Sequence, residues 1–461
     1  MNNFKIKKIS HKPPRKPLSE KTKQNILTAV GIILLVVFIY YSGMQLIDRL
    51  SGTKLIQFFS GLFGTELSVD DKGHTNILIA GVGGEGHEGK DLTDTLMIAS
   101  VDNTSKTVSM ISVPRDLYVE STMGGMRINR LYEQAKIKWN DPDEALDLLK
   151  KTLENILAVE IPYSIKIDFE AFEKIIDELG GVEINVEQDI ADPDYPDANY
   201  GYDPFYLSQG LQHLDGKTAL KYVRSRKSSS DFDRSKRQQQ LLVAIKEKVT
   251  DKSILTRKSF LKKMYYSLTD HIETNMSISE MLSLAEFAIE WDSKNLSVAT
   301  LNDEPIFRGG FLYTPLRELY GGAFVLLPAG DNFNSIRQFT ELVFYEPKNL
   351  NDLPIIILNG TTQNGLAARV KSIFHRFGIN ILEVGNSQIQ NLRETTIYAS
   401  QDAKSLADFI GKLIPAIIIT QEMPEAKLLI ELGEDSIPFI EKLDIFKNVV
   451  QLVPAPGTPT Q

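Results

Sequence analysis

The sequence predicts an α/β protein in which two domains follow one membrane-spanning segment. Three observations lead to this prediction. Gln24–Ile47 contains no charged residue, patterns of short apolar strands and amphipathic helices alternate from residue 76 onward, and a second α/β pattern begins after the polar linker Asn349–Leu353. A chain of 461 residues is also too long for a single hydrophobic core, so two or more domains are expected.

Composition excludes several classes of function. The net charge is −9, which argues against a general nucleic-acid-binding protein. The chain has no cysteine, and this rules out disulfides, thiolate metal sites and cysteine nucleophiles. The absence of thiols is compatible with an exported protein.

The N-terminal region predicts a membrane anchor. Residues 1–23 carry eight Lys or Arg and one acid, Glu20, and are expected to form a disordered cytoplasmic tail. Residues 24–47 exceed the roughly 20 apolar residues that cross a bilayer. The alternative is a cleaved signal peptide, but the apolar run is long and no A-x-A site follows it. We therefore predict an uncleaved anchor, an extracytoplasmic bulk, and a partly helical connector over residues 48–73.

A glycine loop follows the first predicted strand, Asn76–Ile79. Gly81–Gly89 contains a G-x-G-x-x-G pattern and part of a Walker A pattern, although Asp91 stands where the latter needs Ser or Thr. Both nucleotide-binding motifs require a helix directly after the loop. Asp94–Val101 is rich in β-branched and apolar residues and predicts a strand, so we reject both interpretations.

The remaining elements of the first domain, residues 74–348, follow from periodicity and caps. Thr107–Val113 predicts a strand that ends at Pro114, with Arg115 directly after it. Asp189–Leu207 predicts a surface loop, with a lid over the site as the alternative. Up to Phe344 the pattern predicts short strands and turns. Further helices are expected at Asp143–Leu157, Glu170–Leu179 and Met276–Ile289, and a further strand at Val182–Val186.

The second domain, residues 349–445, has its own alternating pattern. Strands are expected at Pro354–Leu358, Ile379–Val384, Thr395–Tyr398 and Ala416–Thr420, and helices at Leu366–Phe377 and Ala403–Leu413. Residues 446–461 predict a disordered tail.

The basic stretch Tyr222–Gln240 is the strongest candidate for a functional site. Arg224 and Arg226 end an apolar segment that predicts a strand, and residues two apart on a strand face the same side. Asp231 is a suitable N-cap for a following helix. On that helix Arg234, Arg237 and Gln238 occupy positions i, i+3 and i+4.

These residue types suit one class of ligand. Guanidinium groups are planar, permanently charged forks that match phosphate oxygens. Together with the carboxylates of Asp231 and Asp233, they indicate a site for a pyrophosphate and a divalent cation. The alternative interpretation is a solvated, charged turn.

Seven ordered motifs between Asn76 and Phe344 resemble the LytR-CpsA-Psr (LCP) family, also called cell envelope-related transcriptional attenuators. They are NILIAG, LTDTLMIAS, SMISVPRDLYV, INRLY, IIDELGGVEINV, GLQHLDGKTALKYVRSR and DFDRSKRQQQ. The segments IIILNGTTQNGLAARV and TTIYA resemble the LytR C-terminal domain that often accompanies this family.

The resemblance implies a mixed central β-sheet between helices, which holds a polyprenyl pyrophosphate with its lipid tail in an apolar tunnel. The implied activity is a phosphotransferase that moves a glycopolymer from this carrier onto peptidoglycan, with Mg²⁺ or Mn²⁺ as cofactor. The residue roles carried over by motif are Asp94 as metal ligand and catalytic residue, Arg115 and Arg234 as catalytic and pyrophosphate-binding residues, and Arg224, Arg226 and Gln238 as pyrophosphate-binding residues. Asp231 matches the last motif of the family and is the second candidate to hold the metal. Asp94 is also a candidate to accept the proton of the acceptor hydroxyl.

The chain departs from the family pattern at two positions. Glycines near Gly83 stand where the family usually has a loop acid, and Leu92 stands where an arginine often precedes the catalytic aspartate. Glu85, His87 or Asp91 are the candidates to replace the missing acid. Three rival functions remain: a polyprenyl-pyrophosphate phosphatase, a non-catalytic lipid-phosphate-binding envelope protein, and a transcription attenuator, which the lack of a DNA-binding motif disfavours.

Overall fold

The computed structural model describes residues 65–87, 89–196, 201–225, 231–250, 271–330, 332–346, 353–423 and 426–446. The predicted basic tail, the membrane anchor and the C-terminal tail beyond residue 446 lie outside these ranges. Within them, no helix has both the length and the apolar character needed to cross a bilayer.

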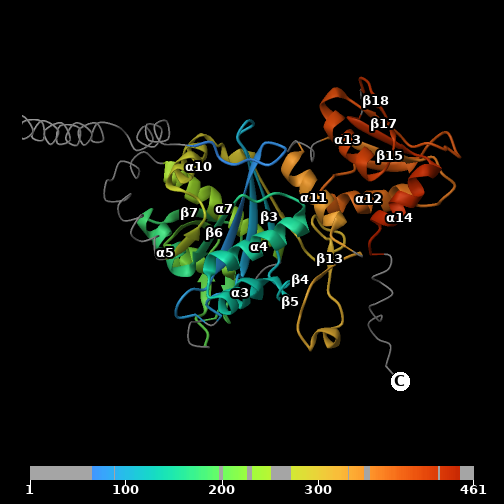
Figure 1. The fold of residues 1–461 in the computed structure, drawn as a ribbon. Helices are drawn as coiled ribbons and strands as arrows, with labels where there is room; N and C mark the ends of the chain where they lie inside the picture. The colour runs from blue at the N-terminus through green and yellow to red at the C-terminus, as the bar shows by residue number, and fades with distance from the viewer. Residues whose placement is uncertain are drawn as a thin grey trace, which may run out of the picture.

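A six-stranded mixed sheet forms the centre of the first domain (Figure 1). Its order is β11-β6-β1-β2-β3-β12. The strands are β1 (His74–Val82), β2 (Thr95–Asp102), β3 (Thr107–Val113), β6 (Tyr163–Asp168), β11 (Ile272–Thr274) and β12 (Leu296–Thr300). Because β1–β2, β2–β3 and β6–β11 are antiparallel while β1–β6 and β3–β12 are parallel, the sheet is mixed, as expected.

Helices cover both faces of this sheet. On one face, Leu78, Ile98 and Ile111 pack in a core shared with α3 (Leu131–Trp139), α4 (Pro142–Leu157) and α11 (Asn334–Tyr345). The opposite face presents Met97, Ala99 and Met110 to residues of α7 (Asp231–Thr250) and α10 (Ile278–Glu290). Burial on both sides explains why β2 reads as a nearly continuous apolar run rather than an alternating one.

One edge of the sheet gathers the ends of four strands. Strand pairing places Gly81 opposite Thr95, and Val82 opposite Asp168. Leu96 likewise pairs with Val113, so the residues just after β3 lie beside those just before β2. Neighbouring strands are about 4.8 Å apart, and the loops that leave β1, β3 and β6 therefore converge near the start of β2.

The connector predicted to be partly helical over residues 48–73 is described only from residue 65. Residues 65–73 are not helical, and Asp70 packs inside, where it accepts hydrogen bonds from Asn76 and Tyr345. Two other predictions for the first domain need correction. The predicted surface loop at 189–207 contains the paired strands β8 (Ile190–Asp192) and β9 (Phe205–Leu207). The end of the domain contains the helix α11, which the sequence interpretation missed.

The C-terminal domain is a five-stranded sheet with helices α12 (Leu366–Phe377), α13 (Lys404–Leu413) and α14 (Ile437–Leu443). Its order is β16-β15-β19-β17-β18, with β15 at Ile355–Asn359, β16 at Glu383–Asn386, β17 at Thr396–Ala399, β18 at Ile417–Thr420 and β19 at Leu428–Leu432. Gly378 ends α12 with φ +80°, a left-handed backbone conformation that favours glycine at the end of a helix.

An aromatic cluster joins the two domains. The Phe377 ring from α12 lies 5.1 Å from the Phe311 ring and 6.5 Å from the Phe339 ring of the first domain. Phe409 from α13 extends the cluster, at 6.2 Å from Phe377. These residues belong to one continuous buried core. The two domains are therefore packed together, and Figure 1 shows α11 of the first domain next to α12 of the second.

Candidate functional site

Asp94 and Arg115 form an ion pair at the sheet edge where β1, β3 and β6 end and β2 begins. Arg115 Nη1 donates to Asp94 Oδ1 at 2.9 Å, and Asn129 Nδ2 approaches the same oxygen at 3.4 Å. Arg115 Nε lies 3.5 Å from an oxygen of Asp116, which also pairs with Arg127 at 2.8 Å. Burial opposes the charge of Arg115, but Asp94 and Asp116 outweigh it and raise the pKa of the guanidinium.

This ion pair retains capacity for a ligand. The side chain of Arg115 is 31% exposed and that of Asp94 is 35% exposed. Within the described ranges, no residue hydrogen-bonds to Asp94 Oδ2. The pair can therefore offer an anion a fixed guanidinium and a cation one carboxylate oxygen, which are the two roles predicted for these residues.

Arg224 lies in a helix, so the predicted strand is wrong. The helix α6 (Gly216–Arg224) begins at Asp215, whose carboxylate accepts from the backbone N–H of Thr218 at 2.8 Å. The buried residues Ala219, Leu220 and Val223 have helical spacing and pack inward. The short apolar run therefore forms the inner face of a capped helix, and Arg224 occupies its last turn.

Aromatic side chains orient Arg224 toward the sheet edge. Its guanidinium carbon lies 4.1 Å from the centre of the Phe169 ring, and Nη1 donates to the Tyr195 hydroxyl at 3.1 Å. Phe169 starts α5 (Phe169–Glu178), directly after Asp168 at the end of β6. Sequence analysis did not identify Phe169 or Tyr195, because each meets Arg224 only through the fold. Stacking on Phe169 and the hydrogen bond to Tyr195 hold the guanidinium of Arg224 in a fixed position beside the glycine loop.

The three candidates for the missing loop acid have different surroundings. Glu85 pairs with Lys90 at 2.7 Å in an exposed position, and Asp91 pairs with Lys136 at 2.8 Å. The His87 ring instead packs edge-on against Phe169, with 5.2 Å between centroids. Of the three, only His87 faces the aromatic ring on which Arg224 stacks.

The other predicted site residues are only partly described. Arg226 lies outside the described residues. Helix α7 is described from Asp231 onward, but the side chains of Asp231 and Arg234 lie outside the description, so the N-cap predicted at Asp231 is not tested. Gln238 is half-buried on α7. Their proposed roles remain predictions.

Arg237 differs from its predicted orientation, because it is buried rather than part of an accessible cationic face. Its Nη2 donates to the Ser225 carbonyl at 2.5 Å, and its guanidinium lies 5.8 Å from the Tyr222 ring. The Ser225 hydroxyl donates to Asp192 at 2.9 Å. All three polar residues are at least nine-tenths buried. The network fixes the backbone immediately after Arg224.

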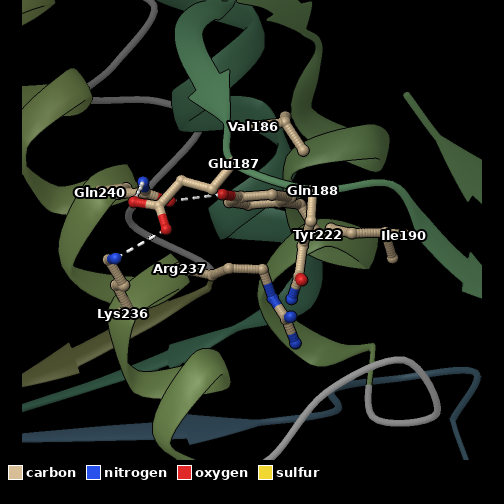
Figure 2. Close-up of a pocket in the computed structure, with 8 residues that line it drawn as sticks. All are labelled: Val186, Glu187, Gln188, Ile190, Tyr222, Lys236, Arg237 and Gln240. Atoms are coloured by element: carbon tan, nitrogen blue, oxygen red, sulfur yellow. Dashed lines mark hydrogen bonds and ion pairs between the residues drawn. The ribbon is translucent and has the colours of Figure 1, made fainter. Parts of the chain in front are cut away.

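A surface hollow lies next to this network, between the end of β7 (Val182–Val186) and helix α7 (Figure 2). Figure 2 shows Glu187 beside Lys236 and Gln240, with Arg237 directed away from them. Glu187 accepts from Lys236 at 2.6 Å and from Gln240 at 3.2 Å. Because the exposed ammonium group of Lys236 is already paired with Glu187, this hollow is a weaker anion-binding site than the sheet edge.

We expect Ser225→Ala to destabilise the protein. It removes one donor from the buried Asp192 carboxylate, and the loss of a partner to a buried charged group costs about 1–3 kcal/mol. The free energy of unfolding in urea should fall by this amount. Ser372→Ala, at an exposed position of α12, is the matched control and should change stability by less than about 0.5 kcal/mol. Equal stability of both variants would contradict the role of this network.

The described residues contain no group of three or more His, Asp or Glu side chains that could hold a metal ion. A magnesium ion that binds phosphates needs only one or two protein carboxylates and keeps water as its other ligands. The free oxygen of Asp94 fits this mode of binding. An all-protein metal cage is therefore not required at this edge.

Comparison with known proteins identifies both domains. The family model described as the LytR_cpsA_psr family matches residues 46–319, and the model described as LytR cell envelope-related transcriptional attenuator matches residues 352–435. These matches confirm the resemblance inferred from the motifs.

Individual relatives carry two kinds of name. The polyisoprenyl-teichoic acid–peptidoglycan teichoic acid transferase TagV of Bacillus subtilis is 28% identical over 48% of this chain and 54% of its own length. The regulatory protein MsrR of Staphylococcus aureus is 30% identical over 59% of this chain and 76% of its own length. The crystal structure of B. subtilis TagV is 25% identical, with a TM-score of 0.45, over 60% of this chain and all of that one.

Proposed function

The chain belongs to the LytR_cpsA_psr family, and from that premise we propose that it transfers a glycopolymer from a polyprenyl-pyrophosphate carrier onto peptidoglycan. The transfer is a phosphotransferase reaction in which the polymer moves together with one phosphate. The name of TagV describes a teichoic acid transferase of this kind, and the sequence similarity of this chain to TagV supports the proposal.

One observation supports the proposal most directly. The edge that presents the Arg115–Asp94 ion pair also presents Arg224, held on Phe169 at the end of the neighbouring strand β6. The strand order places β6, β1, β2 and β3 side by side, so the two arginines flank the start of β2. Two fixed guanidinium groups on either side of one carboxylate form a suitable receptor for a diphosphate.

Phosphoryl transfer mainly requires positioning and neutralisation of charge. In the proposed mechanism, Arg224 binds the diphosphate through its remaining N–H donors. Arg115 stabilises the charge that develops on the transferred phosphoryl group, because its own position is fixed by Asp94 and Asp116. Arg226, Arg234 and Gln238 complete the phosphate contacts. When bound, Mg²⁺ or Mn²⁺ supplies further charge neutralisation, and Asp94 and Asp231 would hold it.

The proposed reaction takes place outside the cytoplasm. The uncharged segment 24–47 anchors the chain in the membrane, and the basic residues before it keep the N-terminus in the cytoplasm. The lipid carrier and peptidoglycan are the proposed partners. Anchoring keeps the enzyme next to a substrate that is itself confined to the bilayer.

The proposal can be tested by incubating the full chain in detergent with a polyprenyl-pyrophosphate-linked oligosaccharide and isolated peptidoglycan. We expect metal-dependent release of polyprenyl phosphate together with oligosaccharide bound covalently to peptidoglycan. Release without a covalent product would indicate a phosphatase. Binding without release at any metal concentration would indicate a non-catalytic lipid-phosphate-binding protein.

A further inference from the structure

The glycine loop after β1 carries a histidine directed at the phosphate-binding end of the sheet. The loop folds back on the sheet edge, where Gly84 has φ +81° and an added Cβ would lie 2.8 Å from the Cβ of Asp168. This close approach brings the loop over the end of β6. His87 then packs edge-on against Phe169, whose ring also carries the guanidinium of Arg224.

The proposed catalytic carboxylate is poorly suited to accept a proton. Asp94 Oδ1 accepts from Arg115 at 2.9 Å and lies 3.4 Å from Asn129 Nδ2. Its other oxygen, Oδ2, is the one that the proposed function assigns to the metal ion. The acceptor hydroxyl therefore requires a different proton acceptor at this edge.

Two described acids in or next to the loop are engaged elsewhere. The Glu85 carboxylate pairs with Lys90, and the Asp91 carboxylate pairs with Lys136 on α3. In contrast, no residue in the described ranges hydrogen-bonds to either ring nitrogen of His87. The ring is also half-buried rather than solvated. Among the loop residues that the structure describes, His87 is the proton acceptor that remains available.

We propose that the imidazole of His87 is the general base of the transfer reaction. This inference rests on the proposed function. His87 accepts the proton of the peptidoglycan hydroxyl, whose oxygen forms a bond to the phosphorus atom attached to the glycopolymer. The bond from that phosphorus to the bridging oxygen breaks, and polyprenyl phosphate leaves with the electron pair. The imidazolium then returns its proton to the leaving phosphate or to water, so atoms and charges balance.

The surroundings of His87 keep it in the form that accepts a proton. Burial lowers the pKa of His87 below its usual 6.5, and the positive charge of Arg224 lowers it further, while Asp168 opposes the shift. Asp168 is itself paired with His271 at 2.8 Å, and Glu85 and Lys90 are charged residues in the described part of the loop and directly after it. The neutral ring therefore prevails at neutral pH. Activity should fall as the pH is lowered through this pKa.

His87→Ala in the full chain tests the inference. We expect the rate of transfer to peptidoglycan to fall about 10²- to 10⁴-fold, with unchanged affinity for the lipid pyrophosphate. Added imidazole should restore part of the rate, and the acidic limb of the pH–rate profile should disappear. His375→Ala, at an exposed position in the C-terminal domain, is the matched control and should behave like the wild type.

The possible outcomes separate this inference from the function on which it rests. A wild-type protein that transfers glycopolymer, with His87→Ala within about twofold of its rate, would overturn the inference alone. So would a variant that loses lipid-pyrophosphate affinity and activity together without rescue by imidazole, because that result assigns His87 to binding. A wild-type protein without transfer activity would overturn both.

Discussion

Arg115→Ala should reduce the rate of glycopolymer transfer about 100- to 1,000-fold, because loss of one fixed donor to a developing oxyanion typically has this effect. The residue is held by two carboxylates, Asp94 and Asp116, and needs no reorientation during the reaction. Arg115→Lys keeps the charge but loses the planar fork, so an intermediate rate is expected. The measurement is metal-dependent release of polyprenyl phosphate by the full chain.

Arg393→Ala is the appropriate control for this variant. Arg393 is exposed on the C-terminal domain, so the same chemical change there should leave the rate within about twofold. The unfolding midpoint of Arg115→Ala should be measured in parallel, since Asp94 loses its guanidinium partner. A variant that stays folded and retains wild-type turnover would remove Arg115 from the mechanism.

Phe377→Ala should lower the free energy of unfolding by about 3–5 kcal/mol, the usual cost of truncating a fully buried phenylalanine. The ring is 2% exposed and contacts Phe311 and Phe339 across the junction between the domains. Because the junction is part of one core, the substitution should also lower the stability of the first domain. Destabilisation of both domains by a substitution in the second is the specific expectation.

Tryptophan fluorescence can detect this coupling. The chain has two tryptophans, Trp139 and Trp291, and both lie in the first domain. Phe377→Ala should therefore shift the urea midpoint reported by tryptophan emission, although the substitution is in α12. Phe439→Ala, where the side chain is 40% exposed, is the control and should cause a much smaller shift. If tryptophan emission reports the wild-type midpoint for Phe377→Ala, the domains unfold independently.

Local patterns predicted most individual elements of this fold. Thr107–Val113, Val182–Val186 and Leu366–Phe377 form the expected strands and helix with the expected bounds. Each carries its own periodicity and a clear terminator, such as Pro114 or Gly378. The strand β19 (Leu428–Leu432) was missed, although its sequence LLIEL is a short apolar run that suits a strand.

The geometry of the site was less accessible to sequence analysis. The apolar run before Arg224 is short enough to form either a strand or a helix. It forms a helix, which is capped by the side chain of Asp215. Tyr195 follows β8, which pairs with β9, and its hydroxyl accepts a hydrogen bond from Arg224 at the end of α6. Such contacts join residues far apart in the chain, and no local pattern encodes them. The Asp94–Arg115 pair, in contrast, follows from two motifs on adjacent strands.

Equilibrium binding of a polyprenyl diphosphate to the full chain tests the central claim most directly. If Arg115 and Arg224 flank one diphosphate site, each alanine variant should bind at least about tenfold more weakly than the wild type, since a charge-assisted hydrogen bond contributes about 1.5–3 kcal/mol. The double variant should bind more weakly than either, and Arg393→Ala should bind normally. Wild-type affinity in both Arg115→Ala and Arg224→Ala would contradict a diphosphate site at this sheet edge.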